Sequence, residues 1–358
     1  MRGYRPQLDS LRALAVTAVL YCHFWSPDTE FAELGVRLFF VLSGFLLTGI
    51  LLREADEARR RQVSQQRILF DFYVRRILRI WPAYYCALFA AIALGATAVQ
   101  QTFGWHALFA TNLLLFRERQ WYPIMTGHLW TLSIEEQFYF VLPLTILFAS
   151  RKLLKPLLIG CIATAVLFRG GVCIGHGTYF YGVLPIAQLD ALGGGALLAL
   201  IQRQKGRIGW KRLVAWSLPI AVLTDVLATY TYSAVHFTFA AALYVLPMAA
   251  MVAGADQGIR GWAEKLLSSR LMVTFGRLSY GVYLYHMFVG AGVDGVLRSM
   301  GQPALPLGPI RFLILSGLTL GVATASWLLL ERPALSLRRY FRRATETAAV
   351  VPAAPSPA

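Results

Sequence analysis

Charge is what this sequence has least of, and acidic residues are rarer than basic ones. Only 15% of the 358 residues are charged, whereas a soluble domain carries about a quarter of its residues as charges. Hydrophobic residues make up 57% of the chain and its mean hydropathy is +0.55, which excludes an ordinary water-soluble domain. The apolar residues recur from end to end in runs of about 20, the length that crosses a bilayer's hydrocarbon. We therefore predict an all-α, polytopic transmembrane helix bundle with no appended soluble module.

Sequence motifs of several common enzyme chemistries are also absent. There is no Walker A loop, Rossmann glycine pattern, G-x-S-x-G or H-E-x-x-H. Ser43 stands in Leu-Ser-Gly without the surrounding nucleophile elbow, and we interpret it as a close-packing residue. We expect no metal site and no tightly bound cofactor. No cysteine belongs to a C-x-x-C pair, which favours small buried hydrophobic side chains over disulfides for Cys22, Cys86, Cys161 and Cys173.

The net charge of +16 comes from 34 Lys+Arg and 18 Asp+Glu. Most of the basic excess lies in short segments between apolar runs, which is the distribution of cytoplasmic loops. It favours topology and contact with anionic lipid over nucleic-acid binding. The loop Ser26–Glu33 holds acids and no base and should face outward, whereas the arginine-rich stretch 53–79 should face the cytoplasm.

About ten spans with both termini cytoplasmic satisfy this charge bias. The run Trp105–Phe116 is too short to span and should be an outer-face or re-entrant helix. Residues Gln65–Trp81 alternate apolar and basic at a helical period and should lie along the inner interface, before Pro82 opens the third span. Residues 1–337 would form the membrane domain, and residues 338–358 a basic and then disordered cytoplasmic tail. The predicted spans are about 11–25, 34–52, 83–99, 128–149, 157–172, 182–201, 213–230, 235–253, 271–293 and 310–330.

Arg12 and His23 stand 11 residues apart in the first predicted span. Three helical turns separate them, so they share one face at a distance of about 16 Å along the axis. An ionisable side chain in hydrocarbon costs roughly 2.5 kcal/mol or more and is a candidate functional group by default. A lone histidine is often a satisfied structural residue, and for His23 both interpretations stay open at this point.

Glu135 and Glu136 lie about one third of the way into the fourth predicted span, with His128 seven residues before Glu135 on the same face. The predicted topology puts Glu135 at the depth of His23, where a carboxylate can fix the tautomer of an imidazole and raise its basicity. The alternative is a tether from the carboxylate to an arginine or tyrosine of another helix. We favour the functional interpretation for Glu135, with Glu136 as a second candidate.

Arg75, Arg76 and Arg79 cluster at the inner end of the third predicted span. Guanidiniums at this spacing suit a polyphosphate, and they suit lipid headgroups equally well. Asp190 lies in the sixth span beside three consecutive glycines, where it could partner an arginine or line a cavity. His286, with tyrosines around it in the ninth span, fits either packing or the wall of a site.

Seven short stretches of the chain together resemble a known family. They are Leu8–Val16 followed by His23, Phe39–Phe45, Arg76–Pro82, His128–Tyr139, Leu189–Leu192, Ser279–His286 and Glu331–Pro333. In this order they are similar to the blocks of the acyltransferase 3 family of membrane O-acyltransferases. One departure is Gln188, where we expect an arginine two residues before the position of Asp190.

The resemblance implies transfer of an acyl group, taken as acetyl, from cytoplasmic acyl-CoA to a hydroxyl group. The acceptor would be an envelope or exported glycan or a lipid-linked saccharide, and the enzyme would sit in the bacterial inner membrane. It implies that His23 is the essential histidine and Glu135 the helix carboxylate. The family's arginines would be Arg12, Arg76 and Arg79.

We hypothesise that these arginines hold the CoA phosphates while His23 acts as general base on the acceptor hydroxyl, oriented by Glu135. An acyl-histidine intermediate is the less favoured variant. A secondary transporter also uses intramembrane His, Glu and Arg, and it is the alternative, although the sequence has no internal repeat of helices. The remaining expected site residues are Glu136, as a third catalytic residue, and Asp190, His128, Tyr139 and His286 in substrate binding.

Overall fold

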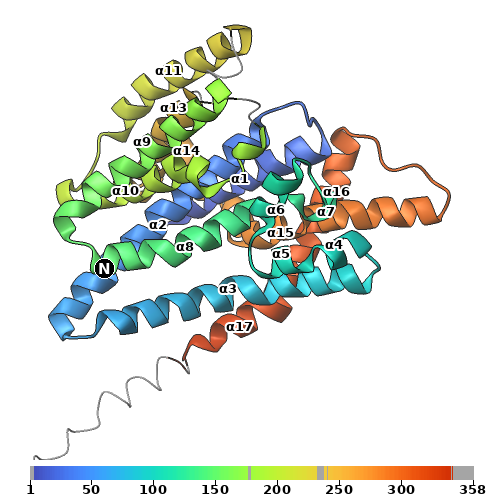
Figure 1. Ribbon diagram of the computed structural model, residues 1–358, viewed down its shortest axis with the longest axis horizontal. Helices are drawn as coiled ribbons and strands as arrows, with labels where there is room; N and C mark the ends of the chain where they lie inside the picture. The colour runs from blue at the N-terminus through green and yellow to red at the C-terminus, as the bar shows by residue number, and fades with distance from the viewer. Residues whose placement is uncertain (1–3, 176–178, 232–237, 240, 340, 342–358) are drawn as a thin grey trace, which may run out of the picture.

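The computed structural model describes residues 4–175, 179–231, 238–239, 241–339 and 341. Within these residues the chain is helical and contains no strand, as predicted. Ten of the described helices have 17 or more residues, and they follow the ten predicted spans in order (Figure 1). They are α1 (Pro6–Phe24), α2 (Phe31–Arg61), α3 (Gln65–Ala93), α8 (Trp130–Phe148), α9 (Arg151–Gly175), α10 (Leu189–Lys205), α11 (Trp210–Thr231), α13 (Ala241–Gln257), α15 (Arg270–Ser299) and α16 (Pro309–Ser326).

Four helical segments in the described residues are long and apolar enough to cross a membrane. In two of them, on α9 and α16, only 22% of the apolar window is buried inside the protein. Large hydrophobic side chains such as Leu167 and Leu313 therefore face outward, 75% and 69% exposed. An apolar outer surface of this kind suits hydrocarbon rather than water. The four segments are Phe31–Arg61, Arg151–Val172, Pro185–Lys205 and Pro309–Ser336.

Helix α2 lies at the centre of the bundle and packs against α1, α8, α10 and α13. Its crossing with α10 is close because glycines of both helices meet the opposite backbone. A Cβ on Gly44 would lie 2.0 Å from the carbonyl oxygen of Leu192, and one on Gly195 would lie 2.0 Å from that of Val41. Small residues allow this approach between membrane helices. Helices α11 and α13 lie at one edge of the bundle and α3 at the opposite edge (Figure 1).

Helix α3 runs unbroken through Pro82. The sequence had predicted an interfacial helix ending at Trp81 and a separate span after Pro82, and this division is wrong. Hydroxyl groups from α15 donate to backbone carbonyls on both sides of the proline, from Tyr280 to Ile80 at 2.7 Å and from Tyr285 to Ala83 at 3.4 Å. These two hydrogen bonds fasten α15 to α3 beside the proline, while the carbonyl that Pro82 itself leaves without a helical donor is that of Leu78.

The stretch Trp105–Phe116 does not form a span, as predicted. It is divided between two short helices at Phe109, whose φ of 50° ends the first of them. His106 holds this region together, since its ring nitrogens lie 2.8 Å from the hydroxyl of Thr111 and 3.2 Å from that of Thr126. The short helices between α3 and α8 are α4 (Thr97–Gln101), α5 (Phe103–Ala107), α6 (Thr111–Glu118) and α7 (Ile124–Gly127).

The remaining elements are short. The predicted tail lies almost entirely outside the described residues, and so does the start of the eighth predicted span. A π-helical turn follows α16 and places Glu331, 4% exposed, inside the bundle. These elements are η1 (Tyr179–Tyr181), η2 (Pro185–Gln188), α14 (Trp262–Leu267), η4 (Trp327–Glu331) and α17 (Arg332–Ser336).

The described cysteines are free, but they are less buried than expected. Cys86 is exposed on the outer side of α3, and Cys22 and Cys161 are half-buried. The prediction of a buried side chain is therefore wrong for Cys86, because apolar positions of a membrane helix also face outward. The side chain of Cys173 lies outside the described residues.

Candidate active site

A cavity of about 1160 Å³ runs between α1, α2, α3, α8 and α15. Charged residues from the basic segments line one end, so this end is the polar mouth. The opposite, inner end is lined by apolar and hydroxyl-bearing side chains. The mouth includes Arg53, Glu54, Arg75, Arg203 and Arg338, and the inner end includes Val36, Phe39, Thr131, Leu132 and Tyr283.

The three arginines predicted to bind substrate all line this cavity. Arg12 pairs with Asp9 at 2.8 Å. Arg76 and Arg79 form no hydrogen bond or ion pair with any described residue, although the guanidinium of Arg76 lies 5.3 Å from the ring centre of Tyr139. Arg76 is half-buried and Arg79 is exposed, and a guanidinium that lines a cavity without a protein partner has its N–H donors free to bind an anion.

Glu135 also lines the cavity, and its carboxylate is held within a triangle of hydrogen bonds. Ser43 donates to Oε1 at 2.7 Å, Tyr139 donates to Oε2 at 2.8 Å, and the two hydroxyls lie 3.1 Å apart. Tyr139 lies four residues after Glu135 on the same helix, so the link from α8 to another helix runs through Ser43 of α2 rather than through the arginine or tyrosine expected for a tether. No contact between Glu135 and His23 is described. Ser43, expected only to allow close packing, is the third member of this cluster.

His23 meets two other histidines at a point where three segments converge. The ring centres of His23 and His286 lie 4.9 Å apart, and those of His286 and His128 lie 4.7 Å apart, both edge-to-face. His23 comes from the last turn of α1, His286 from α15 and His128 from the turn before α8. The sequence predicted each residue as a candidate, but nothing in the spacing predicted that they meet.

In each ring of this histidine cluster, one nitrogen lies within hydrogen-bond distance of a backbone carbonyl oxygen. Nδ1 of His23 lies 2.9 Å from the carbonyl of Val19, and Nδ1 of His286 lies 2.6 Å from that of Tyr283. Nε2 of His128 lies 3.0 Å from the carbonyl of Leu284. A carbonyl only accepts, so these nitrogens donate and the opposite nitrogen of each neutral ring carries a lone pair. In the described residues no group donates to those second nitrogens, and Nδ1 of His128 and Nε2 of His286 are fully buried.

The cavity stops short of the histidine cluster. None of its three histidines lines the cavity, whereas Thr131 and Tyr283, in contact with His128, do. Glu136 lies outside the cavity as well: one of its oxygens accepts from the indole of Trp81 at 3.4 Å, and the other is buried without a described partner. Most of the predicted residues therefore divide between a cavity group and a histidine group, and Glu136 belongs to neither.

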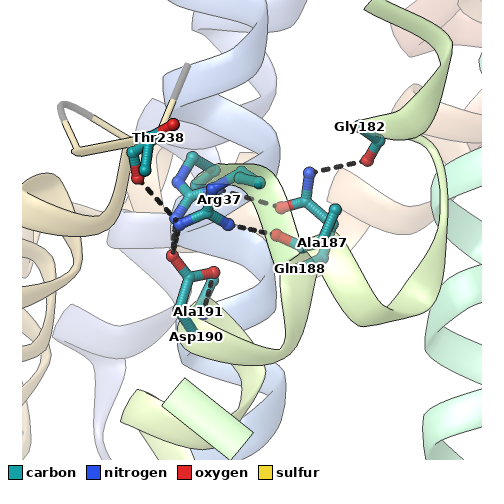
Figure 2. A network of polar contacts seen from close by, with 8 residues as sticks. Arg37, Gly182, Ala187, Gln188, Asp190, Ala191 and Thr238 are labelled. Atoms are coloured by element: carbon teal, nitrogen blue, oxygen red, sulfur yellow. Dashed lines mark hydrogen bonds and ion pairs between the residues drawn. The ribbon is translucent and has the colours of Figure 1, made fainter. Parts of the chain in front are cut away.

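Asp190 belongs to neither group. Its carboxylate accepts from Arg37 at 2.7 Å and from Arg169 at 2.6 Å, and its other oxygen accepts from the backbone of Ala191 at 2.8 Å (Figure 2). All three charged side chains are at most 2% exposed. The sequence left open whether Asp190 partners an arginine or lines a cavity. In the structure it partners two arginines and does not line the cavity. The ion cluster ties α2, α9 and α10 together.

The position of Asp190 within its helix also differs from the prediction, because the predicted span 182–201 put Asp190 near its middle. The residue lies in the first turn of α10 rather than in mid-helix, because the chain before it forms the 3-10 turn η2. Gln188, which departs from the family pattern, accepts from Arg37 at 3.1 Å and donates to the carbonyl of Gly182 at 3.0 Å (Figure 2). Arg37 and Arg169 were missed, although an arginine inside an apolar run is a signal for such a cluster.

The family comparison agrees with this arrangement. Residues 5–328 match the acyltransferase domain that defines the acyltransferase 3 family. The chain therefore belongs to this family, and the match covers the histidine cluster and all of the cavity lining except Tyr4, Leu335 and Arg338. No solved structure matches the chain.

Several curated relatives carry acetyltransferase names. The chain is 28% identical over 316 residues to the peptidoglycan O-acetyltransferase OatA of Listeria monocytogenes, covering 80% of this chain and 49% of the relative. It is 30% identical over 326 residues to a putative peptidoglycan O-acetyltransferase, YrhL, of Bacillus subtilis, covering 79% and 48%. Nodulation protein 10 of Rhizobium leguminosarum is 26% identical, covering 94% of this chain and 95% of the relative. The chain thus spans about half the length of the first two and nearly all of the third.

Proposed function

We propose that this protein is a membrane O-acyltransferase that moves an acetyl group from acetyl-CoA to a hydroxyl of a glycan. The observation that carries the proposal is that Arg76 and Arg79, which have no described hydrogen-bond or ion-pair partner, line a cavity that ends beside the histidine cluster. An anionic carrier bound at the arginines would present its far end toward the histidines. Acyl-CoA has this form, with phosphates at one end and a thioester at the other.

The ten long helices are proposed to be ten spans with both termini in the cytoplasm of a bacterial cell, in the inner membrane. The support comes from the basic segments at the cavity mouth, which the positive-inside rule assigns to the cytoplasm. This orientation opens the cavity to cytoplasmic acyl-CoA. It places His23, at the other end of α1, toward the outer face, where an envelope glycan is available.

The donor is proposed to bind through its phosphates. Guanidiniums bind phosphate in a bidentate way that lysine does not reproduce. Arg76 and Arg79 have their donors free for this purpose, and Arg12 adds a third cation beside them. The ring of Tyr139, whose hydroxyl is held by Glu135, lies beside the guanidinium of Arg76 and helps to position it. The thioester arm then extends along the apolar wall toward Tyr283.

His23 is proposed as the general base. Its Nδ1 donates to the carbonyl of Val19, so Nε2 is the nitrogen with the lone pair, and a backbone carbonyl fills the orienting role that the sequence assigned to Glu135. Nε2 takes the proton of the acceptor hydroxyl while the oxygen attacks the thioester carbonyl carbon. The carbon–sulfur bond then breaks, and the proton passes from His23 to the leaving thiolate to give free CoA.

The acceptor is proposed to be a polysaccharide or lipid-linked saccharide, since two of the relatives are named for peptidoglycan. The test uses the full chain in proteoliposomes with acetyl-CoA and peptidoglycan oligosaccharides. We expect release of CoA thiol together with an acetyl ester on the glycan, and loss of both in His23→Ala. A fold check by size-exclusion chromatography accompanies the variant. Full transfer by folded His23→Ala would rule out this mechanism, whereas uptake of solute without thiol release would indicate a transporter.

A further inference from the structure

Tyr283 separates the donor cavity from the histidine cluster. Its ring lines the inner end of the cavity, while the same ring lies 5.7 Å from the centre of His128 and 5.5 Å from that of His286. On the cavity side it meets Phe39 edge-to-face at 6.1 Å. One side chain thus has the cavity on one side and the buried imidazoles on the other.

The position of this ring is fixed by its hydroxyl. Thr131 donates to the phenolic oxygen at 2.7 Å, and Tyr283 donates to the carbonyl of His128 at 3.0 Å. Tyr283 is only 6% exposed and Thr131 only 4%. A buried ring anchored at its tip by two hydrogen bonds keeps one rotamer more strictly than apolar packing alone would.

We propose that Tyr283 is a specificity-determining residue, whose ring closes the inner end of the cavity and limits the length of the acyl group that reaches His23. This inference rests on the proposed function. A thioester carbonyl must come within about 3–3.5 Å of the attacking hydroxyl to react, and the acyl chain beyond it must fit in the space on the histidine side of the ring. An acetyl group adds one methyl group there, whereas each further methylene has to displace Tyr283 or Phe39.

The test compares donors of different length with single variants. Thiol release and glycan esters are measured for acetyl-, propionyl- and butyryl-CoA with the wild type, Tyr283→Ala and Tyr283→Phe. Because one methylene in a pocket changes discrimination by roughly 10- to 200-fold, we expect the preference of the wild type for acetyl over butyryl to fall by about tenfold or more in Tyr283→Ala. Tyr283→Phe keeps the ring but loses both hydrogen bonds that anchor it, so its preference should fall between those of the wild type and Tyr283→Ala.

Tyr285→Ala is the matched control. This tyrosine is also buried on α15 and hydrogen-bonded, to Ser326 at 2.9 Å, but it does not line the cavity. It should cost stability without changing the ratio of acetyl to butyryl transfer. If Tyr283→Ala does not fold, Tyr283→Leu replaces it, with the same direction of change expected.

The outcomes distinguish a failure of the proposed function from a failure of the role proposed for Tyr283. A wild type that releases no thiol from any donor overturns the proposed function and this inference with it. A wild type that transfers acetyl, with an unchanged donor preference in the folded Ala or Leu variant, overturns the role of Tyr283 alone. An equal loss of preference in Tyr285→Ala would assign the effect to general loosening of α15 and would also overturn it.

Discussion

Removing the carboxylate of Asp190 should destabilise the bundle strongly while leaving donor binding intact. Asp190 is the shared acceptor of Arg37 and Arg169, and the carboxylate and both guanidiniums are at most 2% exposed. Breaking a buried ion pair by deleting one partner costs about 3–5 kcal/mol, because a buried charge stays behind. Asp190→Asn leaves two such charges, so we expect a loss at least at the upper end of this range, about 4000-fold in the folding equilibrium.

The measurement is unfolding of the purified protein in mixed micelles, by titration with a denaturing detergent. Arg169→Met supplies the second side of a double-mutant cycle, since removing one cation together with the carboxylate relieves part of the imbalance. We expect the double variant to be more stable than Asp190→Asn alone. Additive losses would show that the ion cluster does not act as a unit.

The same variant decides between a structural and a substrate-contacting role. Asp190 does not line the cavity, so any Asp190→Asn protein that remains folded should keep the wild-type KM for acetyl-CoA. A raised KM with unchanged unfolding would refute the reasoning and restore the aspartate to the substrate site.

Other variants test the cavity and the helix crossing. Arg79→Ala should raise the KM for acetyl-CoA by about 10- to 100-fold, because a hydrogen bond to a charged group contributes about 1.5–3 kcal/mol, and Arg79→Lys should recover only part of the loss; an unchanged KM would contradict phosphate binding there. Gly44→Ala places a methyl group 2.0 Å from the carbonyl oxygen of Leu192, so it should lower the detergent-unfolding midpoint, whereas Gly160→Ala, with open space around its Cβ position, should not. Equal midpoints would contradict the close crossing of α2 and α10.

The helices themselves were largely predictable from the sequence because runs of apolar residues and the distribution of arginine report directly on the bilayer. What the sequence predicted less well was where helices continue. Pro82 ended a predicted segment, yet α3 passes through it, and Tyr280 and Tyr285, about 200 residues away, donate to carbonyls on either side of it. No local signal carries that information.

The membership of the candidate site was predicted better than its contacts. Polar side chains in apolar runs identified Arg76, Glu135 and His23, since hydrocarbon makes each of them costly without a partner. Partner choice depends on how helices rotate about their axes, which spacing along one helix does not determine. Glu135 was therefore assigned to His23 by depth, whereas its oxygens accept from Ser43 and Tyr139.

The division of the site has a chemical reason in the proposed transfer. A donor that enters from one side and an acceptor that enters from the other must meet at a point closed to free passage, or the membrane would leak protons and water through the same path. The anchored ring of Tyr283 and the histidines, each with one ring nitrogen on a backbone carbonyl, fill that point. The cation-lined cavity therefore stops short of the histidines, and in the proposed transfer His23, half-buried at the end of α1, is the group at which donor and acceptor meet.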